Sequence, residues 1–173
     1  MSEESSRPPG QTRAIAPFAT RATSRTRVEG RGTVTEYLAF RLGTDAFGAP
    51  VAMIREILKP PPMTHVPRAP RHVLGIVSVR GLVVTVFDLR RLMRLAEPPL
   101  TSRARILLVG NNEETLGLMV DEVLEVHRLP EGDIERASVV VGSDVSEAVS
   151  GIARPREDRD EVLVLLDLRV LLR

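Results

Sequence analysis

The sequence contains two similar stretches, and this internal duplication strongly limits the folds that the chain can adopt. Gly48, Val51, Ile54, Glu56 and Ile57 recur 69 positions later as Gly117, Val120, Val123, Glu125 and Val126. The stretch from Val86 to Met93 recurs at an offset of 79 as Leu165 to Leu172. The offset grows between the two matches, so we predict inserted residues in the second copy, in the polar, Ser-rich stretch Val139–Ser150.

The apolar pattern within each copy favours short strands. Leu38, Phe40 and Leu42 alternate with other residues, and this period of two is typical of a half-buried strand, which we place at Val34–Leu42. Further strands are expected at Phe47–Val51, Met53–Leu58, Gly75–Val79, Leu82–Phe87, Arg105–Val109, Thr115–Val120, Val123–His127, Val139–Val141 and Glu161–Leu166. Arg80–Gly81 separates two of these strands and predicts a tight hairpin, and Pro50 is expected at a sheet edge or bulge. Aromatic residues make up only 3% of the chain, so the core must be built from Val, Leu and Ile.

The duplication predicts an all-β fold with two similar units. Each copy supplies strands for one small antiparallel sheet, which removes its unpaired edges by curling into a barrel. A barrel of roughly 60 residues buries too little surface to be stable alone, so two of them should pack together and share a core, with a groove between them. We expect the body at 34–173, with subdomains at about 34–95 and 103–173.

The segment 1–33 differs from the body in composition. It is rich in Ser, Thr, Arg, Pro and Gly, and its six Arg and three Glu give it a net charge of +3. We predict a disordered basic tail, because such a segment buries too little apolar area to offset its ordering entropy. The body carries 18 basic and 20 acidic residues, so it has no basic surplus for nucleic-acid phosphates. A nucleic-acid binder that uses the Arg-rich tail beside a small barrel remains an alternative.

Composition also narrows the compartment and the chemistry. The chain has no Cys, which excludes disulfides and thiolate metal sites. No apolar run reaches the roughly 18–20 residues that span a bilayer, and no secretory signal is visible, so we expect a cytoplasmic protein. The three histidines, His65, His72 and His127, lack ligand-like spacing, and no nucleophile motif or phosphate-binding loop is present. We therefore expect no metal, no cofactor and no enzymatic activity.

Two aspartates stand at equivalent positions of the two copies. Asp88 and Asp167 each follow an apolar strand and precede Leu-Arg, with apolar residues spaced for one face of a single helical turn. A carboxylate at that place accepts hydrogen bonds from the free N–H groups of the turn, as an N-cap. Because the feature occurs in both copies, we favour structural caps over a catalytic acid–base pair.

Arg80 and Glu56 are the charged residues most suited to an interface. Arg80 lies at the tip of the predicted hairpin beside Gly81, and guanidinium groups are favoured at interfaces. Glu56 lies on a strand of the same copy and could pair with Arg80 or with a cation of a partner. An exposed pair of this kind adds only about 0–1 kcal/mol to stability, so stability alone explains it poorly.

An ordered series of segments resembles the CheW family. The series contains Tyr37–Leu42, Phe47–Val51, Ile54–Leu58, Val66–Pro70, Val73–Ile76, Val79–Val84 leading to Asp88–Arg90, Gly117–Val123 and Leu163–Leu172. The resemblance implies two intertwined SH3-like five-stranded β-barrel subdomains with short helical turns. It also implies a non-catalytic adaptor that couples the regulatory domain of a CheA-type histidine kinase to the cytoplasmic tip of a methyl-accepting chemoreceptor, and that meets the membrane only through receptors.

The resemblance implies which residues bind partners. The positions that match the family's receptor contact, between the barrels, are Ile54, Glu56, Gly75, Arg80, Val123 and Val126, and Gly81 completes the hairpin tip. Ile54, Val123 and Val126 would form the apolar centre, and Gly75 would allow close approach of backbones. Flagellar chemotaxis and a related chemosensory pathway both remain open.

Overall fold

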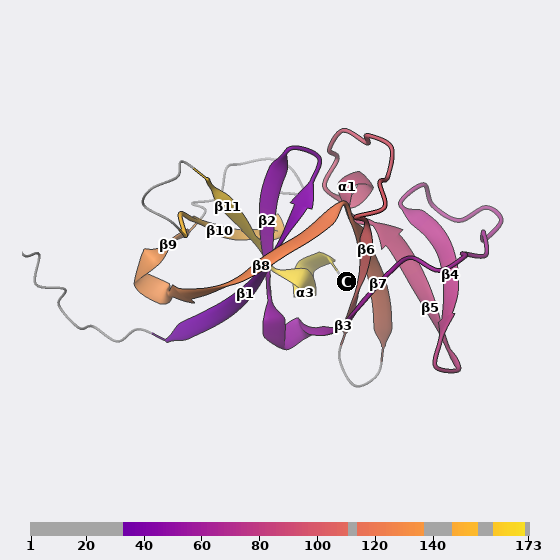
Figure 1. Cartoon of the computed structure of the whole chain (residues 1–173), viewed down its shortest axis with the longest axis horizontal. Helices are drawn as coiled ribbons and strands as arrows, with labels where there is room; N and C mark the ends of the chain where they lie inside the picture. The colour runs from indigo at the N-terminus through magenta and orange to yellow at the C-terminus, as the bar shows by residue number, and fades with distance from the viewer. Residues whose placement is uncertain (1–32, 111–113, 137–146, 156–160, 172–173) are drawn as a thin grey trace, which may run out of the picture. The chain divides into compact units, whose positions relative to one another are not determined.

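The computed structural model describes residues 33–110, 114–136, 147–155 and 161–171, and these residues form two β-sheets (Figure 1). The five-stranded sheet has the order β3 (Ile54–Leu58), β6 (Arg105–Gly110), β7 (Thr115–Val120), β5 (Leu82–Asp88) and β4 (Val73–Val79). The six-stranded sheet has the order β8 (Glu122–Pro130), β1 (Val34–Leu42), β2 (Asp45–Pro50), β11 (Leu163–Leu166), β10 (Val149–Ala153) and β9 (Ile134–Arg136). The predicted all-β class is confirmed.

Short helical turns connect the strands. The 3₁₀ turns are η1 (Val51–Met53) and η2 (Glu131–Asp133), and the α-helical turns are α1 (Leu89–Leu92) and α3 (Leu168–Leu171). The α turns follow Asp88 and Asp167, where the spacing of apolar residues predicts them. Among the described residues, no helix has the length and apolar content needed to cross a membrane.

The two copies of the repeat exchange strands. β1 and β2 belong to the first copy and pair with each other, but on its other side β1 pairs with β8 of the second copy. In the same way β6 and β7 belong to the second copy, but β6 pairs with β3 and β7 pairs with β5, both of the first copy, and β4 of the first copy lies beside β5. The pairing is equivalent in both sheets, because β2 runs parallel to β11 as β7 runs parallel to β5. The subdomains expected at 34–95 and 103–173 therefore follow the repeat, whereas each sheet contains strands of both halves.

The exchange of strands places one apolar core between the two sheets. Its buried members come from β1, such as Phe40 and Leu42, and from β6 and β7, such as Leu107 and Leu118. Two smaller clusters lie within the individual sheets, around Val86 in one and Leu165 in the other. Because the sheets bury each other through the shared cluster, neither is an independent unit, as the small size of each predicts.

The hairpin predicted at Arg80–Gly81 is present. β4 and β5 pair antiparallel with Val79 opposite Leu82, which leaves two residues in the turn. Arg80 has a φ of 51° and Gly81 a φ of 84°, and positive values at both positions are typical of a type I′ turn.

Several details differ from the sequence-based expectation. Pro50 closes β2, which is an interior strand; it is tolerated because β11 pairs only with Ala46–Gly48 and has ended before Pro50. β9 was not predicted, and β10 includes the last two residues of the stretch expected to be a polar loop, Val149 and Ser150. The predicted strand Val139–Val141 and the predicted disordered tail, apart from Thr33, lie outside the described residues.

Candidate functional site

Arg80 projects from the hairpin tip and bonds to Glu56 on β3. The Arg80 Nη2 donates to Glu56 Oε1 at 2.8 Å, and the Arg80 side chain is 78% exposed. β3 and β4 are the two edge strands of the five-stranded sheet, and Arg80 follows β4. The ion pair therefore connects the end of one edge strand with the other edge strand. The pair brings two of the expected partner-binding residues together at the surface.

The tip also exposes apolar side chains. Leu82 and Val83 follow Gly81 at the start of β5, and they are 63% and 71% exposed. Large aliphatic side chains with that exposure beside an arginine are a typical composition for a protein–protein contact. Sequence reasoning did not single out these two residues, although their place beside the hairpin turn was a signal that could have done so.

Ile54 and Val123 occupy equivalent positions of the repeat but lie in different sheets. Ile54 begins β3, and Val123 lies near the start of β8. Both are partly buried and pack against the core cluster that the two sheets share. Val126 lies farther along β8 opposite Leu38 of β1 and is 49% exposed. The apolar residues of the expected site thus come from both sheets.

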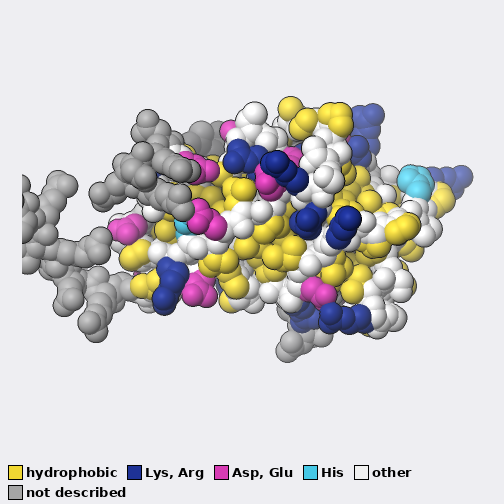
Figure 2. Space-filling model, in the orientation of Figure 1, with side chains coloured by type: hydrophobic (Ala, Val, Ile, Leu, Met, Phe, Trp, Pro, Cys, Tyr) yellow, Lys and Arg dark blue, Asp and Glu magenta, His cyan; other side chains and the backbone are white. Residues whose placement is uncertain are grey.

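The face that carries β8 exposes many apolar side chains. Figure 2 shows hydrophobic side chains over the middle of this face, with Lys and Arg side chains among them. Figure 1 places β8 across the same region. Apolar side chains with arginine among them are a usual composition of a surface that binds another protein.

Gly75 is buried, and the close approach it allows is made by this chain's own backbone. A Cβ atom on Gly75 would lie 2.5 Å from the carbonyl oxygen of Thr64, and the residue has a φ of 153°. Thr64 forms a bridge to Ile76 there, with an N–H···O distance of 2.9 Å in each direction. Gly75 therefore allows the close approach of Thr64 within this sheet, and the backbone contact with a partner that the sequence interpretation gave it stays a prediction.

Asp88 and Asp167 hold equivalent N-cap hydrogen bonds. Asp88 Oδ1 accepts from the Arg90 N–H at 3.0 Å, and Asp167 Oδ1 accepts from the Arg169 N–H at 2.9 Å. Their own N–H groups donate at 2.8 Å to His72 and Ala148, respectively. With these bonds, each carboxylate holds the start of a helical turn.

Asp88 has a second role that the sequence did not reveal. Its side chain is only 1% exposed and accepts from Arg90 twice, at 3.1 Å from Nε and at 2.9 Å from Nη2. The hydrogen bond to Asp88 raises the pKa of Arg90, and the charges of Asp88 and Asp121 act in the same direction. Both oxygens of this carboxylate are therefore bonded to one guanidinium, in a charge-assisted pair that is stronger than a neutral hydrogen bond.

An apolar cavity is lined by side chains from both α1 and α3. Its lining includes Leu92 of α1, Leu171 of α3 and Phe87, Leu116 and Leu118 from the five-stranded sheet. His72 stacks on Phe87 at its edge, with ring centroids 5.8 Å apart. The described residues contain no cluster of three or more His, Cys, Asp or Glu arranged to hold a metal ion.

The match of the sequence to a family model decides the family. Residues 36–173 match the model of the CheW-like domain. The chain belongs to the CheW family. The residues that match the CheW-like domain include strands of both sheets and the hairpin tip. The sequence-based identification is confirmed.

Relatives of known name match over most of the CheW-like region. The Chemotaxis protein CheW of Helicobacter pylori is 27% identical over 152 residues, which cover 88% of this chain and 90% of that protein. Protein FrzA of Myxococcus xanthus is 31% identical over 99 residues, covering 57% of this chain and 62% of that protein. The crystal structure of the scaffolding protein TtCheW from Thermoanaerobacter tengcongensis aligns with a TM-score of 0.70 and 25% identity, covering 81% of this chain and 88% of that chain. This CheW-like chain thus has the CheW fold of two barrel-like subdomains.

Proposed function

We propose that this protein is a non-catalytic signalling adaptor, which holds a CheA-type histidine kinase through its regulatory domain and binds the cytoplasmic tip of a chemoreceptor. The observation that carries the proposal is the match to the CheW-like domain across both sheets. The chemotaxis proteins named CheW and the scaffolding protein TtCheW, to which the chain is similar, support the same role. An adaptor needs surfaces rather than chemistry, and it acts by coupling the binding of one partner to that of another.

The proposed partner-binding surface contains Arg80 and Glu56 at the hairpin tip and the apolar residues Ile54, Val123 and Val126. Exposure supports this assignment, because Arg80 and Val126 remain accessible in the folded chain. The positive φ of Arg80 is further support. A non-glycine residue in the left-handed region is held there at a local energetic disadvantage, and such positions are concentrated at functional sites.

The similarity to Protein FrzA favours a second candidate of the same class. That relative does not bear the name of a chemotaxis protein, so the chain could serve a chemosensory pathway other than flagellar chemotaxis. The mechanism would be unchanged, since the adaptor would still join a kinase to a receptor. Only the identity of the two partners would differ.

Isothermal titration of the purified chain with a kinase regulatory domain and, separately, with a receptor signalling tip tests the proposal. We expect Arg80→Ala and Glu56→Lys to weaken the binding of at least one partner, while the free energy of unfolding changes by no more than about 0.5 kcal/mol, as is usual for surface substitutions. Arg136→Ala is the matched control, because Arg136 is 80% exposed and pairs with Glu131 at 2.7 Å on the six-stranded sheet. Unchanged affinity of both Arg80 and Glu56 variants for both partners would show that the site assignment is wrong.

A further inference from the structure

Asp121 is the single residue between β7 and β8, two consecutive strands that lie in different sheets. Its backbone N–H donates to the carbonyl oxygen of Arg41 on β1 at 3.1 Å. Its Oδ2 accepts from the N–H of Gly43, in the turn between β1 and β2, at 2.6 Å. Asp121 is therefore hydrogen-bonded to the six-stranded sheet at the point where the chain leaves the five-stranded sheet.

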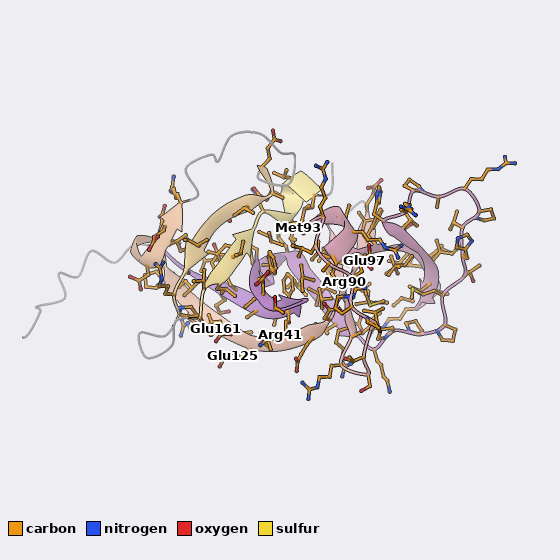
Figure 3. The ribbon with its side chains drawn as sticks, turned by 90° about the horizontal axis from the view of Figure 1, so that it is seen from above. Arg41, Arg90, Met93, Glu97, Glu125 and Glu161 are labelled. Carbon is orange, nitrogen blue, oxygen red and sulfur yellow. The ribbon has the colours of Figure 1, made fainter. Side chains whose placement is uncertain are left out.

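The other carboxylate oxygen of Asp121 accepts from a buried arginine that belongs to the five-stranded side. Arg90 Nη1 donates to Asp121 Oδ1 at 3.0 Å and to the carbonyl oxygen of Pro98 at 2.6 Å. The same guanidinium holds both oxygens of Asp88 at the end of β5, and its side chain is 5% exposed. One cation thus connects a strand end, the segment after α1 and the crossing residue (Figure 3 labels Arg90).

Among the described residues, the equivalent positions of the repeat do not form this connection. Ala52 stands 69 positions before Asp121 and carries no carboxylate. Arg169, the counterpart of Arg90, is exposed. At the equivalent crossing from β2 to β3, the chain instead turns through η1, whose apolar residues Val51 and Met53 pack against the shared core. The two crossings are therefore fixed by different forces: directional charged hydrogen bonds at Asp121 and non-directional apolar packing of Val51 and Met53 at the other crossing.

We propose that Arg90 is a positioning residue which, with Asp88 and Asp121, fixes the orientation of the five-stranded sheet relative to the six-stranded sheet. Geometry supports this role, because the guanidinium is a rigid planar fork that holds its acceptors in defined directions. Apolar packing also resists separation of the sheets, but the hydrophobic effect is non-directional, whereas these hydrogen bonds fix angles as well as distances. The sheets should therefore lose their unique orientation when the network is broken, and each sheet should keep its own hydrogen bonds.

If the proposed function is right, this orientation also sets the partner surface. Ile54 lies on the five-stranded sheet and Val123 on the six-stranded sheet, so their relative position depends on how the sheets are held. A partner that contacts both sheets should bind an Arg90 variant less tightly. A partner that contacts only one sheet should bind it normally. This consequence rests on the proposed function, whereas the orientation itself does not.

The orientation can be measured without any partner. The chain has no Cys, so cysteines introduced at Ser78 on β4 and Glu36 on β1, both exposed, are the only attachment points for spin labels. Pulsed electron resonance on the labelled full chain then reports the distance between the sheets. We expect one narrow distance distribution in the parent, and a broader or shifted one after Arg90→Lys, because an ammonium cannot hold Asp88 by two parallel bonds and also reach Asp121.

Arg169→Lys is the matched control, since it makes the same chemical change at the equivalent position of the repeat and should leave the distribution unchanged. Asp121→Asn is the second variant and serves if Arg90→Lys does not fold. An asparagine side chain cannot accept from both Arg90 and Gly43 as the carboxylate does, so it also should broaden the distribution. Amide exchange within each sheet should remain slow in both variants. A distribution as narrow as the parent's and at the same distance, in a folded Arg90→Lys or Asp121→Asn chain, would overturn the proposal.

Discussion

Replacing each of the two equivalent aspartates by asparagine should have very different consequences for stability. Asp167→Asn keeps an oxygen that accepts from the Arg169 N–H, and Asn is as effective an N-cap as Asp. We therefore expect its free energy of unfolding to change by no more than about 0.5 kcal/mol. Asp88→Asn also keeps an oxygen for the cap, but it removes the charge that faces the buried Arg90 and puts an NH₂ group in place of one acceptor.

The magnitude for Asp88 follows from burial. Removing one partner of a buried ion pair generally lowers stability by about 3–5 kcal/mol, because the remaining charge stays buried. Arg90 keeps Asp121 and the Pro98 carbonyl oxygen, so we expect the lower end, about 3 kcal/mol. With a urea m-value of about 2 kcal/mol/M, the unfolding midpoint of Asp88→Asn should fall by about 1.5 M.

Urea unfolding followed by circular dichroism on both variants and the parent measures this difference. The comparison is internal, since both aspartates stand at the end of a strand and precede a four-residue helical turn. Equal midpoints for the two variants would refute the reasoning, because they would mean that Asp88 acts as a cap alone. A changed m-value would indicate instead that the compactness of one of the states had changed.

Two further predictions concern glycine and the hairpin turn. Gly75→Ala should destabilise the chain, because the new methyl group meets the Thr64 carbonyl oxygen at 2.5 Å; Gly132→Ala, where no atom lies within 4 Å, should be nearly neutral, and thermal unfolding of both variants checks this. Arg80→Asn should raise stability by about 0.5–1 kcal/mol in urea unfolding, because Asn adopts a positive φ more readily, yet it should weaken partner binding in titration. A stability loss in Arg80→Asn would contradict the view that this turn position is occupied by arginine for binding.

The sequence was sufficient for the class of fold because its evidence is local. Alternation in Val34–Leu42 predicts β1, and the two-residue gap at Arg80–Gly81 predicts the β4–β5 hairpin. The Asp-Leu-Arg segments predict α1 and α3 by the spacing of their apolar residues. The duplication adds that the two halves are built alike, which the equivalent pairing of β2 with β11 and of β7 with β5 confirms.

The partner of each strand is a long-range property, and the sequence did not predict it. A repeat shows that β3 and β8 are equivalent, but both pairing within a copy and exchange between copies satisfy the same local pattern. β10 was missed because Ser150 and Gly151 interrupt its apolar residues, and Gly151 fits a close approach to the Glu135 carbonyl oxygen. Strand order therefore required the structure.

The buried network of Arg90, Asp88 and Asp121 could not be predicted from the sequence for a similar reason. Arg90 was recognised only as part of a repeated segment, and no role was assigned to Asp121 from the sequence. They lie 31 positions apart and meet because β5 and β7 are parallel neighbours. Among the expected binding residues, the Arg80–Glu56 contact was suggested by the predicted hairpin, whereas the burial of Gly75 against Thr64 could not be read from local sequence.

The most direct test of the adaptor role is sedimentation of this chain mixed with a kinase regulatory domain and a receptor signalling tip, each purified. The account predicts that one species contains all three proteins, and that the kinase domain and the receptor tip sediment separately when this chain is omitted. If the chain binds neither of them, or if one partner always displaces the other, it does not join a kinase to a receptor and the central claim is wrong.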